Sequence, residues 1–270
     1  MQPLHALLAT LFVPGSAHFV LGRPVRAVVV ALTTIGLFWI GYSIVGTHMW
    51  YHELVPSTGG GIRGLLFRIF PVMMLPESPN LGCTMVASMM RDIDSVEAMR
   101  LERMPGGLVH LGLLLTACSG VLNALWMCDA HWLAQNREPR AKIAPPMAAL
   151  ASWLLPGSGH VLAGQRDKGL LLGAAVLVMF FGGLAISGGH AVDRVLADAW
   201  FDGQVLCGTG VIFGSLVTAP LRYDALPTYN DLGITLCTVA GFMNLLVMTN
   251  AYTVAEDGPD SVVVVEEAKS

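Results

Sequence analysis

Histidines at matched positions are the side chains of this sequence best suited to chemistry, because imidazole can ligate haem or a metal ion and transfers protons near neutral pH. His18 and His160 stand in the same local sequence, and His48 and His190 occupy equivalent ends of two apolar runs. Those run ends suit polar residues at a membrane surface better than ligands. No Cys and His spacing typical of a zinc site occurs, and no GxSxG elbow frames a serine nucleophile. We therefore expect no metal, no cofactor and no catalytic residue, with a membrane-embedded lipid-processing enzyme as the minor alternative.

Amide and carboxylate side chains in two apolar runs are the second candidates. Asn123 and Asp129 in the first run correspond to Asn244 and Asn250 in the second. An ionisable group at membrane depth is destabilising without a partner, so it suggests a function by default. One interpretation is hydrogen bonding between closely packed helices, and the other is a proton or ion pathway through Asp129. Hydrogen bonding is favoured, because the counterpart of Asp129 is neutral.

Two copies of one motif place these residues on equivalent elements. The motif residues are Pro14, Gly15, Ser16, His18, Gly22 and Arg26 in the first copy, and Pro156, Gly157, Ser158, His160, Gly164 and Lys168 in the second. The copies are separated by a constant 142 residues (156 − 14 = 142), and the two asparagine-bearing runs by 121 residues (244 − 123 = 121). An internal repeat decides the architecture before any single motif does. The chain is therefore predicted to consist of two fused homologous halves.

Each motif is expected to interrupt a helix. Pro14 has no N–H for the carbonyl four residues earlier, and its ring crowds that carbonyl. Gly15 and Ser16 then provide a permissive bend and a cap. Inside lipid the freed backbone groups need partners, which Ser16 and His18 are placed to supply. The same argument applies to the second copy, so each motif is predicted to be a structural break or a binding site.

Composition indicates a membrane protein. The 270 residues are 54% hydrophobic and 13% charged, with a mean hydropathy of +0.63, whereas about a quarter of the residues are charged in an ordinary soluble domain. Several charge-free runs are long enough to cross a hydrocarbon core of about 30 Å. A net charge of −4 without a dense basic patch argues against nucleic acid. Four of the five cysteines lie inside apolar runs, which favours packing thiols.

We expect an all-α polytopic transmembrane helical bundle. The first half covers 1–142, the second half 143–255 and an acidic tail 256–270. Each half contains, in this order, a broken segment, a long span, a middle segment and a closing span. In the first half these four lie at about 3–22, 24–46, 62–76 and 107–134, and in the second half they lie at about 146–164, 168–189, 204–221 and 231–254. The sequence is compatible with the broken segments and 62–76 either crossing the membrane or not crossing it, so five to eight spans are possible. The first half also carries an insertion at about 80–106, interpreted as an amphipathic helix that the second half lacks.

The motif, followed by a glycine and basic residues, resembles the PG-x-GH-x-x-x-G signature of small bacterial two-helix membrane domains. With the run from Ala240 to Ala251 as its close, each half is similar to an uncharacterised bacterial polytopic membrane family of unknown function. The chain departs from the repeated pattern at Ala17, Gln165 and Asn250. The resemblance implies a membrane fold present as two fused copies, and no established activity.

A non-catalytic function fits these features best. We expect an integral protein of the bacterial cytoplasmic (inner) membrane that serves as a scaffold or accessory subunit, with the 80–106 helix and the acidic tail as partner surfaces. Expected partners are membrane lipids and other membrane-protein subunits or further copies of the chain, and not nucleic acid. The alternative is a small-molecule or ion transporter or channel, because interrupted segments at corresponding positions of two halves can form a midplane site.

Overall fold

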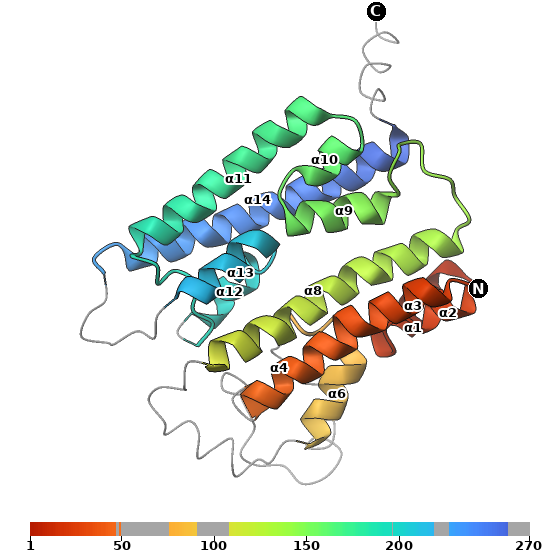
Figure 1. Cartoon of the computed structure of the whole chain (residues 1–270), viewed down its shortest axis with the longest axis horizontal. Coiled ribbons are helices and arrows are strands. Elements are labelled where there is room, and N and C mark those ends of the chain that lie inside the picture. Colours follow the sequence, from red (N-terminus) through yellow and green to blue (C-terminus); the bar gives the residue numbers. More distant parts are fainter. Residues whose placement is uncertain (47–48, 50–75, 91–107, 196, 219–226, 259–270) are drawn as a thin grey trace, which may run out of the picture. The chain divides into compact units, whose positions relative to one another are not determined.

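The computed structural model describes residues 1–46, 49, 76–90, 108–195, 197–218 and 227–258 (Figure 1). Every regular element in these residues is a helix, which confirms the predicted all-α class. The chain forms two compact units. Unit 1 comprises Met1–Ala130 and Asp193–Asp198, and unit 2 comprises His131–Val192 and Ala199–Ser270. A short stretch from the second half of the sequence therefore belongs to unit 1.

Four helices in the described residues are long and apolar enough to cross a membrane. They are Pro24–Val45 (α3, η1 and α4), Leu108–Ala134 (α8), Arg166–Ile186 (α11) and Asn230–Asp257 (α14). The shortest has 21 residues and is about 32 Å long, which matches a hydrocarbon core. In the first of them a π-helical stretch, Leu32–Gly36 (η1), joins α3 (Pro24–Ala31) to α4 (Leu37–Val45). These helices support a membrane-embedded protein.

The predicted span at 204–221 is wrong, because the helix in this region is short. α13 runs only from Gly208 to Val217 and has 10 residues, which is about 15 Å. It ends at Thr218, whose backbone is extended at ψ 114°. The preceding helix, α12 (Asp198–Gln204), is separated from α13 by a turn. The apolar run is therefore divided between two short elements, neither of which is long enough to cross.

The two broken segments fold back on themselves. They consist of α1 (Pro3–Phe12) with α2 (Ser16–Val20), and α9 (Pro145–Leu154) with α10 (Ser158–Leu162). The longer helix of each pair has 10 residues, about half the length needed to cross. Hydrogen bonds tie the short helix to the longer one: Ser16 Oγ donates to Ala9 O at 3.0 Å, and Gly159 N donates to Ser152 Oγ at 3.1 Å. This length fits segments that enter the membrane without crossing it.

α6 (Leu81–Met90) is the counterpart of α13. Both helices have 10 residues, and they are offset by 127 residues (208 − 81 = 127). Gly120 of α8 leaves no room for a Cβ beside the chain that enters α6, and Gly241 of α14 leaves none beside the chain that enters α13. α6 therefore occupies, in the first repeat, the place that α13 occupies in the second, although 80–106 is interpreted from the sequence as an insertion. The rest of that segment and nearly all of 62–76 lie outside the described residues.

Paired glycines bring the long and closing helices together in each unit. A Cβ on Gly41 would lie 2.7 Å from Gly112 O, and a Cβ on Gly183 would lie 2.8 Å from Gly233 O. These distances are too short for a real side chain, so the backbones can approach this closely only where both helices carry glycine. The contact recurs at equivalent positions of the two repeats.

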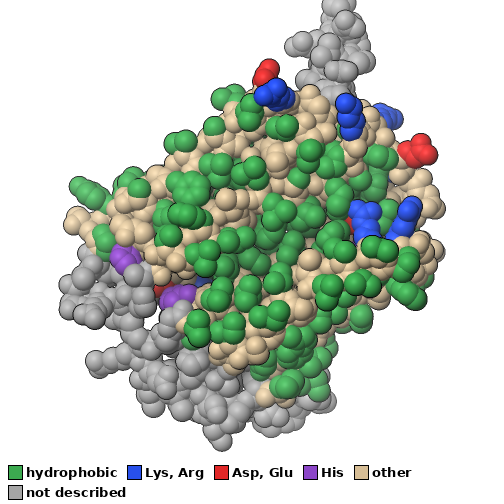
Figure 2. All heavy atoms as spheres, viewed as in Figure 1, with side chains coloured by type: hydrophobic (Ala, Val, Ile, Leu, Met, Phe, Trp, Pro, Cys, Tyr) green, Lys and Arg blue, Asp and Glu red, His purple; other side chains and the backbone are tan. Residues whose placement is uncertain are grey.

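The outer faces of the long helices are apolar. On Pro24–Val45 the exposed side chains include Val25, Val28 and Leu32, and on α11 they include Leu170, Leu171 and Val178. Figure 2 shows hydrophobic side chains over much of the visible surface. An outer face that exposes this many apolar side chains needs lipid or another protein to cover it.

Candidate functional site

A left-handed glycine opens the turn of each PGSxH motif. Gly15 has φ +89° and Gly157 has φ +81°, a region that residues with a Cβ adopt only with strain. The same glycines allow close approach to the long helix. A Cβ on Gly15 would lie 2.5 Å from Ala27 O, and one on Gly157 would collide with Gly169 O, at the equivalent position of the second repeat. Each motif therefore packs the backbone of the broken segment directly against the long helix.

Hydrogen bonds complete the two turns in the same way. Arg23 N donates to His18 O at 2.9 Å, and Gln165 N donates to His160 O at 2.8 Å. Beyond each short helix a second glycine, Gly22 or Gly164, has positive φ and redirects the chain into the long helix. The conformation of the motif is thus repeated residue for residue.

In unit 1 the motif histidine meets the acid of the closing span. His18 Nε2 lies 3.0 Å from Asp129 Oδ2, and both side chains are fully buried. Arg26 Nε lies 2.8 Å from the same oxygen and is partly exposed. Because one carboxylate oxygen faces two donors, Asp129 ties the broken segment and the long helix to α8. The sequence singled out all three residues without showing that they meet.

In unit 2 the equivalent contact is neutral. His160 Nε2 lies 2.9 Å from Asn250 Oδ1. An amide oxygen only accepts hydrogen bonds, so Nε2 of the ring is the donor. Lys168 stands where unit 1 has Arg26. The two repeats therefore keep the histidine and its acceptor, and differ in the charge of the acceptor.

The asparagines of the closing spans hold two other segments in place. Each side chain donates to one carbonyl of the broken segment and to one carbonyl of the chain that enters α6 or α13. Asn123 Nδ2 donates to Thr10 O (3.0 Å) and to Pro79 O (2.6 Å). Asn244 Nδ2 donates to Ser152 O (3.1 Å) and to Leu206 O (2.8 Å). Both asparagines are fully buried. These contacts fit the hydrogen-bonding interpretation, because both amide protons of each side chain are used between elements.

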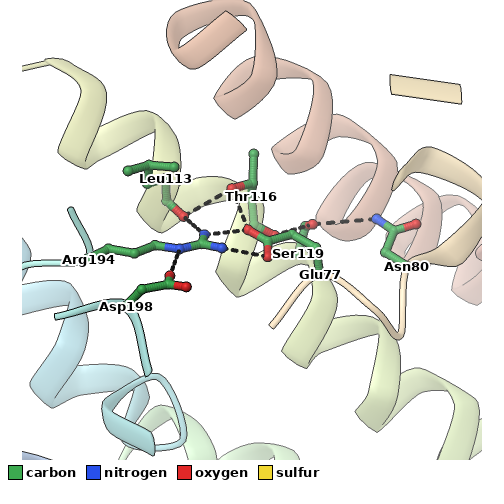
Figure 3. Close-up of polar contacts among 7 residues, drawn as sticks. All are labelled: Glu77, Asn80, Leu113, Thr116, Ser119, Arg194 and Asp198. Atoms are coloured by element: carbon green, nitrogen blue, oxygen red, sulfur yellow. Dashed lines mark hydrogen bonds and ion pairs between the residues drawn. The ribbon is translucent and has the colours of Figure 1, made fainter. Parts of the chain in front are cut away.

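A buried charge cluster in unit 1 was missed by the sequence analysis (Figure 3). Arg194 Nη2 donates to Glu77 Oε2 at 2.9 Å, and Nη1 donates to Glu77 Oε1. Arg194 Nε also donates to Asp198 Oδ1 at 3.2 Å. Glu77 is fully buried and Arg194 is 5% exposed. Burial disfavours the charged guanidinium, but the two carboxylates outweigh this effect and raise the pKa of Arg194.

Hydroxyl and amide groups of the same unit surround the ion pair. Thr116 Oγ1 donates to Glu77 Oε1 at 2.8 Å, and Arg194 Nη1 donates to Leu113 O at 3.2 Å. Asn80 Nδ2 donates to Ser119 Oγ at 3.4 Å (Figure 3). The charge of Glu77 is therefore balanced both by an ion pair and by hydrogen bonds, which is the condition for burying a carboxylate.

The second repeat replaces this ion pair with an amide. Gln204 stands at the Glu77 position (77 + 127 = 204), and its Nε2 donates to Ala191 O at 3.0 Å and faces Ile234 O at 3.5 Å. Ile234 corresponds to Leu113 (113 + 121 = 234). An amide can donate and accept, whereas a carboxylate only accepts, so Arg194 supplies the donor that Glu77 lacks. Pairing 81–90 with 208–217 in the sequence would have aligned Glu77 with Gln204.

No metal-binding group stands out among the described residues. No three His, Cys, Asp or Glu side chains in that part of the chain are grouped so that they could hold a metal ion. The described cysteines are free, and four of the five are buried.

A family model for a family of unknown function, DUF6677, matches residues 5–142 and again residues 147–261. The chain belongs to this family. The two matched segments correspond closely to the two halves inferred from the repeat, which fits two fused copies. Searches of curated proteins and of solved structures found no match to the chain. Membership in this family therefore supports two related halves and does not assign an activity.

Proposed function

We propose that the protein is a non-catalytic scaffold or accessory subunit of a complex in the bacterial cytoplasmic membrane. One observation carries the proposal: the polar residues repeated in both halves are buried in contacts between helices. His18, His160, Asn123 and Asn244 are all fully buried, and each bonds to another helical element of its own unit. Side chains used in this way hold helices in place and do not face a substrate.

The serine hydroxyl of the first motif supports a non-enzymatic function. Ser16 Oγ donates to Ala9 O at 3.0 Å, and the imidazole of His18 faces Asp129. A serine nucleophile would need to bond to the histidine base. The serine and the histidine of this motif have different partners, so the residue types of a triad do not form one.

Partner contacts fit the apolar face of α6 best. Val86, Met89 and Met90 are 47%, 66% and 65% exposed on this short helix. Methionine side chains adapt to varied protein surfaces. α6 is too short to cross the membrane, so an exposed face on it can be covered by a neighbouring subunit as well as by lipid.

Co-purification of the tagged full chain in mild detergent tests the proposal. We expect one or more membrane subunits to copurify at a fixed ratio, and we expect the Met89→Ser/Met90→Ser variant to lose them. The control variant, Val25→Ser/Val28→Ser, changes equally exposed residues on a long helix and should keep them. A chain that copurifies with no subunit at a fixed ratio would contradict the proposal.

A transporter or channel remains the second candidate, because two features favour it. Both repeats carry an interrupted hydrophobic segment at corresponding positions, the arrangement that forms substrate sites in repeat-built transporters. Unit 1 also buries an ionisable group, Asp129, beside Arg26. A flux measurement on reconstituted protein, described with the Asp129 variants below, separates this candidate from the scaffold.

A further inference from the structure

The linker that follows α8 is fastened to the end of α14 in unit 2. α8 ends at Ala134, and Asn136 then adopts φ +52°, which turns the chain. Ala141 N donates to Ala255 O at 3.3 Å, so the linker lies along the last turn of α14. Arg137 Nη1 and Glu256 Oε1 are 2.9 Å apart and join the same two segments. These contacts hold the linker that follows α8 against the end of α14.

A polar pocket of about 320 Å³ lies where this linker meets the end of α14. It is lined by Trp132, Arg137, Glu138, Arg140, Glu256 and Asp257. Arg137 and Glu256 neutralise each other through their ion pair. Arg140, Glu138 and Asp257 form no ion pair with any of the described residues. The pocket therefore offers one cation and two carboxylates to a ligand.

The electrostatics of the pocket favour a ligand that carries both charges. α8 and α14 both end here, and the carbonyl end of a helix attracts cations. Two carboxylates, Glu138 and Asp257, strengthen this attraction. Arg140 instead presents a planar donor group that suits a phosphate. A group with an ammonium next to a phosphate would satisfy all three side chains.

The position of the pocket indicates that the ligand comes from the bilayer. Trp132 lies in the last turn of α8, and its ring contacts the ring of Tyr252 edge to face at a centroid distance of 6.3 Å. Tryptophan and tyrosine near the ends of membrane helices mark the level of the lipid headgroups. A pocket at the ends of two apolar helices therefore opens where phospholipid headgroups are concentrated.

We propose that this pocket binds the headgroup of a zwitterionic phospholipid with a primary ammonium, the phosphoethanolamine type. Arg140 binds the phosphate, and Glu138 and Asp257 accept hydrogen bonds from the ammonium. A primary ammonium donates three hydrogen bonds, whereas a trimethylammonium group donates none. The pocket thus distinguishes an ethanolamine headgroup from a choline headgroup by hydrogen bonding and from an anionic headgroup by charge. The inference stands independently of the scaffold proposal.

Lipid binding to the full chain in mild detergent tests the site. Phosphatidylethanolamine, phosphatidylcholine and phosphatidylglycerol with identical acyl chains are added one at a time, and bound lipid is counted by native mass spectrometry. We expect phosphatidylethanolamine to bind about tenfold more tightly than the other two, the scale of one charge-assisted hydrogen bond. Equal binding of the ethanolamine and choline lipids, or a preference for phosphatidylglycerol, would overturn the proposal.

Matched variants locate the effect in the pocket. Glu138→Gln/Asp257→Asn should remove the preference, whereas Arg140→Gln should weaken the binding of all three lipids, because each of them carries the phosphate. These exposed positions tolerate substitution. Asp167→Asn removes one carboxylate and Lys142→Gln one cation at exposed positions that do not line the pocket. Both control variants should keep the preference. Soluble phosphoethanolamine should compete only weakly, because it lacks acyl chains. Competition as strong as that of the lipid would show that the ligand is a free phosphate ester and would overturn the lipid assignment.

Discussion

At the scale of single residues, the two repeats make equivalent contacts with side chains of different charge. Glu77 with Arg194 in unit 1 matches Gln204 in unit 2. Asp129 with Arg26 matches Asn250, whose counterpart cation is Lys168. In each case a carboxylate in the first repeat requires a cation, and an amide in the second does not. The second repeat is therefore a natural control for substitutions in the first.

Removing Arg194 should strongly destabilise the protein. Arg194→Met leaves the buried carboxylate of Glu77 without its cation, a change that typically lowers the free energy of unfolding by about 3–5 kcal/mol. Adding Glu77→Gln to Arg194→Met should recover much of that loss, because Gln204 occupies the equivalent position without an arginine. Unfolding in mild detergent measures all three variants. A double variant as unstable as Arg194→Met alone would rule out this account of the pair.

Asp129→Asn should have a small effect on stability. The amide oxygen still accepts a hydrogen bond from His18, and Arg26 is 29% exposed, so its guanidinium can turn to water. We expect a loss of about 1.5 kcal/mol, the lower end of the range for a hydrogen bond to a charged group. Adding Arg26→Lys reproduces the residues of unit 2 and should bring stability closer to that of the natural chain.

The Asp129 variant also separates the two proposed functions. In reconstituted vesicles, a scaffold predicts the same proton and ion flux for the Asp129→Asn protein and the natural chain. If the folded variant loses a proton-coupled flux that the natural chain supports, ionisation of Asp129 is the function. The transporter would then replace the scaffold.

At the scale of elements, the motif is a break that lets a short helix fold back on the segment before it. The left-handed glycine and the preceding proline set the turn, and a second glycine returns the chain to the long helix. Because Gly157 has both positive φ and no room for a Cβ, its role depends on tertiary contact as well as on local conformation.

Gly157→Ala should therefore destabilise the protein more than an alanine elsewhere in the same repeat. Left-handed backbone alone adds about 1–2 kcal/mol for a residue with a Cβ, and the contact with Gly169 increases this. The control is Gly182→Ala in α11, where a Cβ would meet nothing within 4 Å and alanine favours the helix. Thermal unfolding in detergent compares the two. Equal unfolding temperatures would show that the turn is not under this constraint.

At the scale of the whole molecule, four crossing helices determine which loops share a side of the membrane. If Pro24–Val45, α8, α11 and α14 cross in turn, the segments after the first and third of them must lie on the same side. From these four crossings alone we predict parallel repeats, with 48–61 and 190–203 on the same side of the membrane. An inverted repeat would need an odd number of crossings in each half.

Cysteine labelling from the two sides of the membrane tests this topology. Ser57→Cys and Ala199→Cys should be labelled from the same side, and Lys142→Cys from the other, in a chain whose exposed Cys128 has been replaced by serine. Labelling of Ser57→Cys and Ala199→Cys from opposite sides would show that the repeats are inverted.

The sequence by itself determined the helical membrane class, the duplication and the positions of the two breaks. These are local properties, since an apolar run, a proline and a left-handed glycine act within a few residues. Pro14 and Pro156 could therefore be identified as helix breaks, and Asn123 and Asp129 as candidate polar contacts.

Only the tertiary structure decided which residues meet and where the helices end. Glu77 and Arg194 are 117 residues apart in sequence, and His18 and Asp129 are 111 apart, so no local pattern connects them. The end of α13 at Val217, before the extended backbone of Thr218, was likewise not visible in the hydropathy, because the run from Gln204 to Leu221 carries no charge. Packing over such separations selects partners by shape and charge across the fold, and these complementarities are not visible within a short stretch of sequence.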